Sequence, residues 1–139
     1  MKRIISKYTI RFIGFLVLLL TTGCPKHPIN GDLDGQWQVM DVVPEAPEII
    51  LQERLYMCFS LHVCQLTEYG NGVNTVGNMK YVKDKTLYLD FPNAHSALSK
   101  ARLKQYGIYS NPVTFTIEHL DKKKLILRDG DVVVTLRKF

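Results

Sequence analysis

The sequence predicts an all-β domain, a small antiparallel up-and-down barrel of about eight strands with one short helix. From Trp37 onward, short runs of alternating apolar residues are separated by turn-forming residues, which is typical of strands joined by hairpins. Helical spacing is found at residues 96–107. Consecutive hairpins make neighbouring strands antiparallel, and closing such a sheet into a barrel removes exposed edges that would otherwise invite aggregation.

The first 23 residues have the three parts of a secretory signal. Four cations and no acid precede an apolar run of nine residues from Phe12 to Leu20, and small residues follow it. Nine apolar residues are too few to span a bilayer, which takes about 20. Pro25 and Pro28 then prevent the helix from continuing. We therefore expect residues 1–23 to be a signal peptide that is removed on export.

The exit sequence LTTGC, which ends at Cys24, resembles a bacterial lipobox, in which the cysteine thiol is acylated before cleavage ahead of it. The resemblance implies a membrane anchor on Cys24, a lipidated tether over residues 24–32 and a folded domain over residues 33–139. Thr21 departs from the pattern, since a leucine usually stands three residues before the cysteine. The alternative is an ordinary signal peptide with a chance cysteine, but no better cleavage site follows.

Removal of the signal changes the charge balance. The whole chain has 18 Lys and Arg against 13 Asp and Glu, and four of these cations lie in the first 23 residues. The remaining 116 residues therefore carry 14 cations and 13 acids, which leaves no basic footprint for a nucleic acid. We expect no nucleic-acid partner. A chain of this length fits one domain with one core.

The longest β-like run, residues 55–69, is either one strand or two strands joined by a bend. Its odd positions from Leu55 to Val63 are uniformly apolar, so we expect this face to form core, whereas the role of the Tyr56 face stays open. On a continuous strand Cys58 and Cys64 would lie about 20 Å apart, too far for a disulfide, so we expect two small buried apolar residues. The other strands are expected at residues 36–43, 78–82, 86–91, 113–120, 125–128 and 132–139.

Local signals mark the helix and the last hairpin. Ser96 suits the N-cap of a helix, and Gly107 suits its end. The three cations between them are expected on a solvated helix face. Asp129 and Gly130 stand between two alternating apolar runs, which strongly favours a hairpin.

Gly35-Gln36-Trp37 stands at the start of the first strand, and Arg137 stands near the end of the last. In a closed meander these two strands pair antiparallel, so the two sites lie side by side. The arrangement resembles the lipocalin signature, a G-x-W motif with a late arginine packed across the indole. The resemblance implies that Gly35, Trp37 and Arg137 form a structural seam, where a cation over an indole contributes about 0.5–2 kcal/mol.

More narrowly, the stretch GCPKHPINGDLDGQWQV and the overall layout resemble small lipocalin-like lipoproteins of Bacteroidetes, a largely uncharacterised group. The resemblance implies an outer membrane lipoprotein that faces the periplasm or the cell surface. Exported lipoproteins of this phylum often carry acids just after the cysteine, but here the first is Asp32, so we favour the periplasm. The triplet Thr67-Glu68-Tyr69 is not at the late position of the lipocalin T-D-Y motif. The chain is also short for a lipocalin, so the cavity is small or filled.

The sequence contains no motif for catalysis or metal binding. Its four histidines have no HxxxH or HExxH spacing, and no cysteine pair has the two-residue gap of a zinc site. On one strand His62 would lie too far from Cys58 and Cys64 for all three to share an ion. A G-x-S-x-G elbow and a phosphate-binding loop are also missing from the sequence. We expect no enzymatic activity, no metal and no cofactor.

Two functional hypotheses remain. The first is a lipid-anchored module that binds a small hydrophobic or amphipathic molecule, with the connection from Pro44 to Arg54 in the place where lipocalins carry a lid. The second is a structural or interaction lipoprotein with a filled barrel, an accessory subunit of an envelope assembly with an unknown protein partner. The alternative role of each wall residue is plain core packing. The candidate ligand contacts are Ile49, Ile50 and Leu51 in the lid and Trp37, Tyr56 and Phe59 in the wall.

Overall fold

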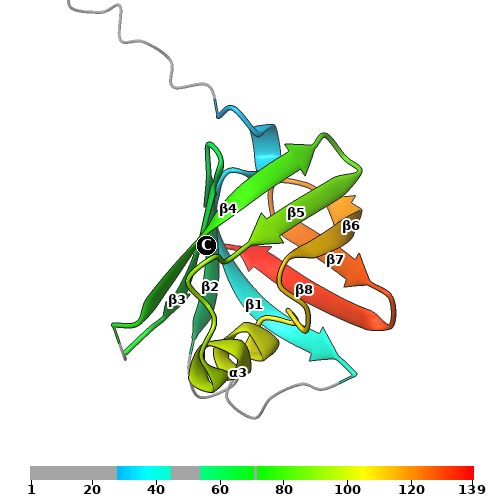
Figure 1. Ribbon diagram of the computed structural model, residues 1–139. Helices are drawn as coiled ribbons and strands as arrows, with labels where there is room; N and C mark the ends of the chain where they lie inside the picture. The colour runs from blue at the N-terminus through cyan, green and yellow to red at the C-terminus, as the bar shows by residue number, and fades with distance from the viewer. Residues whose placement is uncertain (1–27, 45–53, 71) are drawn as a thin grey trace, which may run out of the picture.

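The computed structural model describes residues 28–44, 54–70 and 72–139. Every strand pairs antiparallel with its neighbours in the sequence, and β8 pairs with β1, so the sheet closes into an eight-stranded barrel (Figure 1). The predicted fold class, a closed antiparallel barrel with a short helix, is confirmed. The elements are η1 Gly31–Leu33, β1 Gly35–Val43, β2 Leu55–Ser60, β3 Val63–Glu68, β4 Asn74–Val82, β5 Thr86–Asp90, α3 Ala97–Gln105, β6 Val113–Leu120, β7 Lys124–Asp129 and β8 Val132–Lys138.

Alternation along the strands decides which side chains enter the barrel. In β5 the fully buried Leu87 and Leu89 alternate with partly exposed residues, and β7 repeats the pattern with Leu125 and Leu127. These inward residues belong to one continuous core cluster. Burying each such side chain contributes about 1.5–3 kcal/mol, so the barrel is held together mainly by its interior.

A two-residue turn at Leu61 and His62 joins β2 and β3 into a hairpin. Leu61 has φ +54°, a conformation that leucine rarely adopts, and no turn-forming residue marks the site in the sequence. Because the turn has two residues, the inward positions change from odd to even: Leu61 and Val63 are exposed, whereas Cys64 and Leu66 are buried. The prediction that Leu61 and Val63 belong to the core face was therefore wrong.

The hairpin also sets the positions of the two cysteines. Cys64 pairs with Phe59 and is buried in the core, whereas Cys58 alternates with the inward Met57 and Phe59 and is partly exposed. Both are free thiols. The separation of about 20 Å expected for one continuous strand does not apply, because the chain reverses between them; the two side chains are kept apart by lying on opposite faces of the sheet.

The cation over Trp37 is Lys138 and not, as predicted, Arg137. Trp37 pairs with Lys138 across the β1–β8 seam, and directly paired residues share a face of the sheet. The Lys138 ammonium lies 4.5 Å from the centroid of the indole ring. Arg137 pairs instead with Gln38 on the other face, and its guanidinium donates a hydrogen bond to Gln38 Oε1 at 2.9 Å. The predicted seam position is thus off by one residue.

Lys138 also fastens η1 across one end of the barrel. Its ammonium donates hydrogen bonds to the backbone oxygens of Asp32 and Asp34, at 2.6 and 2.5 Å. The Trp37 indole N–H donates to the backbone oxygen of Leu33 at 2.8 Å. Gly35 (φ +123°) lies against this lysine, and a Cβ there would come within 3.1 Å of its side chain. We call this end of the barrel the η1 end, and the opposite end, where α3 lies, the α3 end (Figure 1).

The helix follows its sequence signals. Ser96 Oγ accepts a hydrogen bond from the Ser99 N–H at 3.0 Å, so Ser96 is the N-cap as predicted. Just past the helix Gly107 has φ +75°, which confirms it as the residue at which the helical path ends.

Candidate functional site

Side chains occupy the interior of the barrel. An eight-stranded barrel encloses a space that either side chains fill or one small ligand occupies. Here Trp37, Met57, Phe59, Phe91 and Phe115 belong to the core cluster, and each has 0 or 1% of its surface exposed. The clefts described below lie outside this packed centre, at the two ends of the barrel. Among the described residues, the two ends of the barrel are therefore the candidate ligand sites.

Helix α3 and the segment after it cover the α3 end. Leu103, Tyr106 and Ile108 extend the barrel core and are each at most 2% exposed. The chain reverses at Gly107, between Tyr106 and Ile108, and a Cβ added to Gly107 would overlap the side chain of Val134. The close approach that Gly107 permits brings α3 against the strand ends, beside a groove of about 530 Å³ that Leu103 and Ile108 help to line.

Four polar residues lie where α3 meets the strands, and we call them the polar cluster. Glu68 ends β3 at the inward position that follows Cys64 and Leu66, and it is only 6% exposed. Arg102 Nε lies 3.5 Å from Glu68 Oε1. Two further polar atoms are buried without a hydrogen-bond partner among the described residues. They are Gln105 Oε1 and the Tyr106 hydroxyl.

Burial governs the electrostatics of this cluster. Burial raises the pKa of the Tyr106 phenol, and the charge of Glu68 raises that pKa further, so the hydroxyl stays a neutral donor. Burial also raises the pKa of the nearby Cys64 thiol. A buried hydroxyl without a partner costs about 1–3 kcal/mol. The α3 end thus offers an unused donor, an unused acceptor and a carboxylate–guanidinium pair beside an apolar core.

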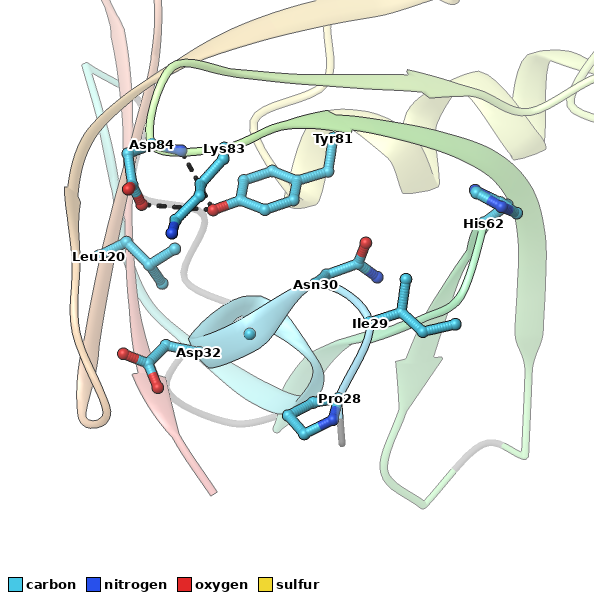
Figure 2. Close-up of a pocket in the computed structure, with 10 residues that line it drawn as sticks. Pro28, Ile29, Asn30, Asp32, His62, Tyr81, Lys83, Asp84 and Leu120 are labelled. Atoms are coloured by element: carbon cyan, nitrogen blue, oxygen red, sulfur yellow. Dashed lines mark hydrogen bonds between the residues drawn. The ribbon is translucent and has the colours of Figure 1, made fainter. Parts of the chain in front are cut away.

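The η1 end has an open cleft of about 840 Å³ between η1 and three hairpin turns. Figure 2 shows Tyr81 extending across it, with Lys83 and Leu120 at one side and His62 and Ile29 at the other. The Tyr81 hydroxyl contacts the Asp84 carboxylate at 3.3 Å and accepts from the Asp84 N–H at 3.1 Å. Burial raises the pKa of Tyr81. The lining is mixed in charge and polarity, and it differs in kind from the apolar interior.

Neither a metal-binding cluster nor a membrane-spanning helix is found among the described residues. Within residues 28–44, 54–70 and 72–139 no three His, Cys, Asp or Glu side chains are grouped so that they could hold a metal ion. His119, near the end of β6, and Asp121, in the β6–β7 turn, contact each other at 2.8 Å. In the same ranges no helix is both long enough and apolar enough to cross a bilayer.

A family model described as a lipocalin-like domain matches residues 18–139. The chain belongs to the lipocalin-like family. A solved lipocalin-like protein from Bacteroides uniformis is 18% identical, with a TM-score of 0.58 over 78% of this chain and 100% of that chain. An uncharacterized protein from Bacteroides eggerthii is 17% identical, with a TM-score of 0.55 over 77% and 99%. The predicted resemblance to lipocalin-like proteins of Bacteroidetes is thus confirmed. Comparison with curated proteins finds no match.

In this lipocalin-like domain the predicted wall residues do not share one surface. Trp37 and Phe59 are packed in the core. Tyr56 lies on the outer face of β2, where its ring meets the ring of Phe139 edge-on at 5.2 Å. It therefore does not face the interior. The remaining predicted site residues, Cys24, Ile49, Ile50 and Leu51, lie outside the described residues.

Sequence patterns did not point to the polar cluster. Arg102 is one of the three cations expected on a solvated helix face, yet it faces Glu68. Glu68 belongs to the triplet Thr67-Glu68-Tyr69, in which no role was expected. A signal exists, because Glu68 continues the inward alternation of Cys64 and Leu66, but it becomes visible only once the turn at Leu61 is placed.

Proposed function

We propose that the chain is an outer membrane lipoprotein, anchored through an acyl group on Cys24, whose barrel binds a small hydrophobic or amphipathic molecule at the α3 end. The anchor rests on the signal and the LTTGC motif, and we favour the periplasmic face of the membrane. The membership of the lipocalin-like family supports ligand binding by a barrel. The observation that carries the proposed site is the polar cluster.

Folded proteins pair nearly all of their buried polar atoms. Among the described residues, the Tyr106 hydroxyl and Gln105 Oε1 are buried without hydrogen-bond partners, and the Tyr106 phenol lies within the electrostatic influence of Glu68. These unpaired atoms make the unliganded barrel less stable than an apolar one. A ligand whose polar end carries a hydroxyl, amide or carboxylic acid supplies the missing partners. Its apolar body would lie against Leu103 and the neighbouring core, so the proposed ligand class is amphipathic.

Binding requires room, because the interior is filled. Helix α3 is the element that can supply it, since the helix is not one of the hydrogen-bonded strands that close the barrel. It is attached through Leu103, Tyr106 and Ile108 and through the ion pair between Arg102 and Glu68. A small outward shift of α3 breaks few backbone hydrogen bonds and opens the end of the barrel.

We propose that the domain is not an enzyme. Lipocalin-like folds typically bind molecules rather than transform them. Burial raises the pKa of both the Cys58 and the Cys64 thiols, so neither is an activated nucleophile.

Dye displacement on the mature chain tests the proposed site. A Cys24→Ser variant keeps it free of lipid, and a bound fluorescent naphthalene sulfonate is competed with medium-chain fatty acids and alcohols. Tyr106→Phe removes the unpaired hydroxyl, so it should stabilise the free domain or leave it unchanged while weakening the competitor by about 2–10-fold. The matched control, Tyr88→Phe, alters a hydroxyl on the outer face of β5. No dye uptake, or equal affinities for both variants, would refute the site.

The packed interior favours a second candidate. Because Trp37, Phe91 and Phe115 fill the barrel centre, the domain can also serve as a rigid accessory subunit of an envelope assembly. Crosslinking in intact cells would then recover one partner protein at a fixed ratio, and the purified domain would take up no hydrophobic probe.

Protease treatment of intact cells distinguishes a periplasmic domain from one on the cell surface. A periplasmic domain is protected until the outer membrane is opened, whereas a surface-exposed domain is cleaved at once.

A further inference from the structure

The start of the described chain is fixed to the η1 end of the barrel. The Asn30 side-chain amide donates to the backbone oxygen of Leu61 at 2.9 Å and to the Asp34 carboxylate at 2.6 Å. The Gly31 N–H donates to the Pro28 oxygen at 3.2 Å. Residues 28–34 are thereby held on the β2–β3 turn, beside the cleft of Figure 2.

The anchor site is close to this point in the sequence. Three residues separate Cys24 from Pro28, and four backbone steps span at most about 14 Å. An acyl group on Cys24 therefore holds the η1 end near the bilayer, whatever path the tether takes. The α3 end, at the opposite end of the barrel, is then directed away from the membrane (Figure 1).

The η1 end presents features that suit a phospholipid surface. Lys83 and Lys85 lie in the β4–β5 turn, Lys122 and Lys123 lie in the β6–β7 turn, and all four are exposed. No ion pair among the described residues involves any of them. Two apolar side chains stand beside these turns: Ile29 is 66% exposed, and Leu61, at the tip of the β2–β3 hairpin, is 54% exposed.

The acids of the same turns are engaged within the protein. The Asp121 carboxylate accepts hydrogen bonds from the Lys123 and Lys124 N–H groups, both at 2.7 Å, and contacts His119. The Asp84 carboxylate contacts the Tyr81 hydroxyl. The lysine ammonium groups, in contrast, remain available to an outside anion, although the acids keep the net charge of this surface low.

We infer that the η1 end is a membrane-docking surface, on which Lys83, Lys85, Lys122 and Lys123 contact lipid phosphates while Ile29 and Leu61 enter the headgroup layer. This inference rests on the acyl anchor proposed above. It assigns the η1 cleft to the bilayer side and the polar cluster to the aqueous side. The ligand of the α3 end would then be exchanged through the aqueous compartment and not drawn directly from the anchoring membrane.

Lysine acetylation on vesicles tests the orientation. The mature acylated chain is reconstituted into phosphatidylethanolamine–phosphatidylglycerol vesicles, and the acetylation rate of each lysine is followed by mass spectrometry against the acyl-free Cys24→Ser chain. The four turn lysines should react several-fold more slowly on the vesicles. Lys100 and Lys104, exposed on α3, are internal controls whose rates should not change. Equal rates at both ends, or slowing at α3 alone, would overturn the orientation.

Charge reversal tests the contact itself. In the acyl-free chain, Lys122→Glu with Lys123→Glu should lower partitioning onto phosphatidylglycerol-rich vesicles by about tenfold or more. The matched control, Lys100→Glu with Lys104→Glu, makes the same change of charge at the α3 end and should have little effect. Equal losses in the two variants would show that only net charge matters and would overturn the docking surface. A mature protein without lipid mass on Cys24 would overturn the anchor and the orientation together, whereas a lipidated protein with unprotected turn lysines would overturn the docking surface alone.

Discussion

Replacing Lys138 by methionine should destabilise the barrel far more than the same change at its neighbour Arg137. Methionine keeps the apolar stem over the Trp37 indole but removes the ammonium, which donates to two backbone oxygens at 2.6 and 2.5 Å and lies 4.5 Å from the ring centroid. Hydrogen bonds from a charged donor contribute about 1.5–3 kcal/mol each when they are buried, and the cation over the indole adds about 0.5–1 kcal/mol.

The loss of stability is smaller than the sum of these values, because the Lys138 ammonium is only partly buried. Water can therefore take over part of the hydrogen bonding that the ammonium provides to the two backbone oxygens. Burial lowers the pKa of Lys138, which shows that its charge is held at some cost in desolvation. We therefore expect Lys138→Met to lower the free energy of unfolding by about 2 kcal/mol, about 5–10 °C in Tm for a domain of this size. Arg137→Met removes one exposed hydrogen bond to Gln38 and should cost less than about 0.5 kcal/mol.

Thermal and urea unfolding of the acyl-free mature chain, followed by circular dichroism, measures both variants. Equal slopes with urea concentration would show that the change lies in the folded state. If Arg137→Met proved as destabilising as Lys138→Met, the cation that holds the seam would be the arginine, and the packing of η1 described above would be wrong.

Three further predictions concern the core, pH and thiol chemistry. Gly77→Ala should destabilise by about 1–3 kcal/mol in urea unfolding, because a Cβ would lie 2.5 Å from the Phe91 ring, whereas Val76→Ala, an exposed neighbour, should change little; equal effects would contradict the close approach. The pKa of Asp121 is lowered from 3.8 to about 2 by backbone N–H groups and His119, so its contribution to stability is present above pH 3.8 and lost toward pH 2. Asp121→Asn should therefore lower Tm at pH 7 but not at pH 2, and a constant difference would refute this. Burial raises the pKa of Cys64, so its thiol should react with an aromatic disulfide reagent only on unfolding; rapid labelling of the native chain would show that this part of the core opens.

The fold was predictable because each part of it has a local cause. Alternation of apolar residues marks the strands, and Ser96 and Gly107 mark the ends of the helix. The sheet closes into a barrel because the first and last strands of the meander would otherwise have unpaired edges. The β2–β3 turn was not fully predictable, because Leu61 supplies its positive φ without any residue that favours one. That turn reverses the face of every later residue in β3, so the inward position of Glu68 was hidden as well.

The β1–β8 seam shows a different limit of prediction from sequence, namely the exact register of paired strands. The motif correctly indicated that the start of β1 meets the end of β8, but the identity of the cation depends on register, and one residue of offset exchanges Arg137 for Lys138. The polar cluster depends on the contact between Arg102 of α3 and Glu68 of β3, two elements far apart in the chain. No short pattern in either element specifies that contact.

Ligand binding at the α3 end is tested most directly by native mass spectrometry of the mature protein, released gently from its own envelope. We expect a one-to-one adduct with the mass of a small amphipathic molecule, retained by the Tyr88→Phe variant and reduced in Tyr106→Phe. If the wild type and both variants carried only the acyl anchor, ligand binding at the α3 end would be refuted and the filled-barrel subunit favoured.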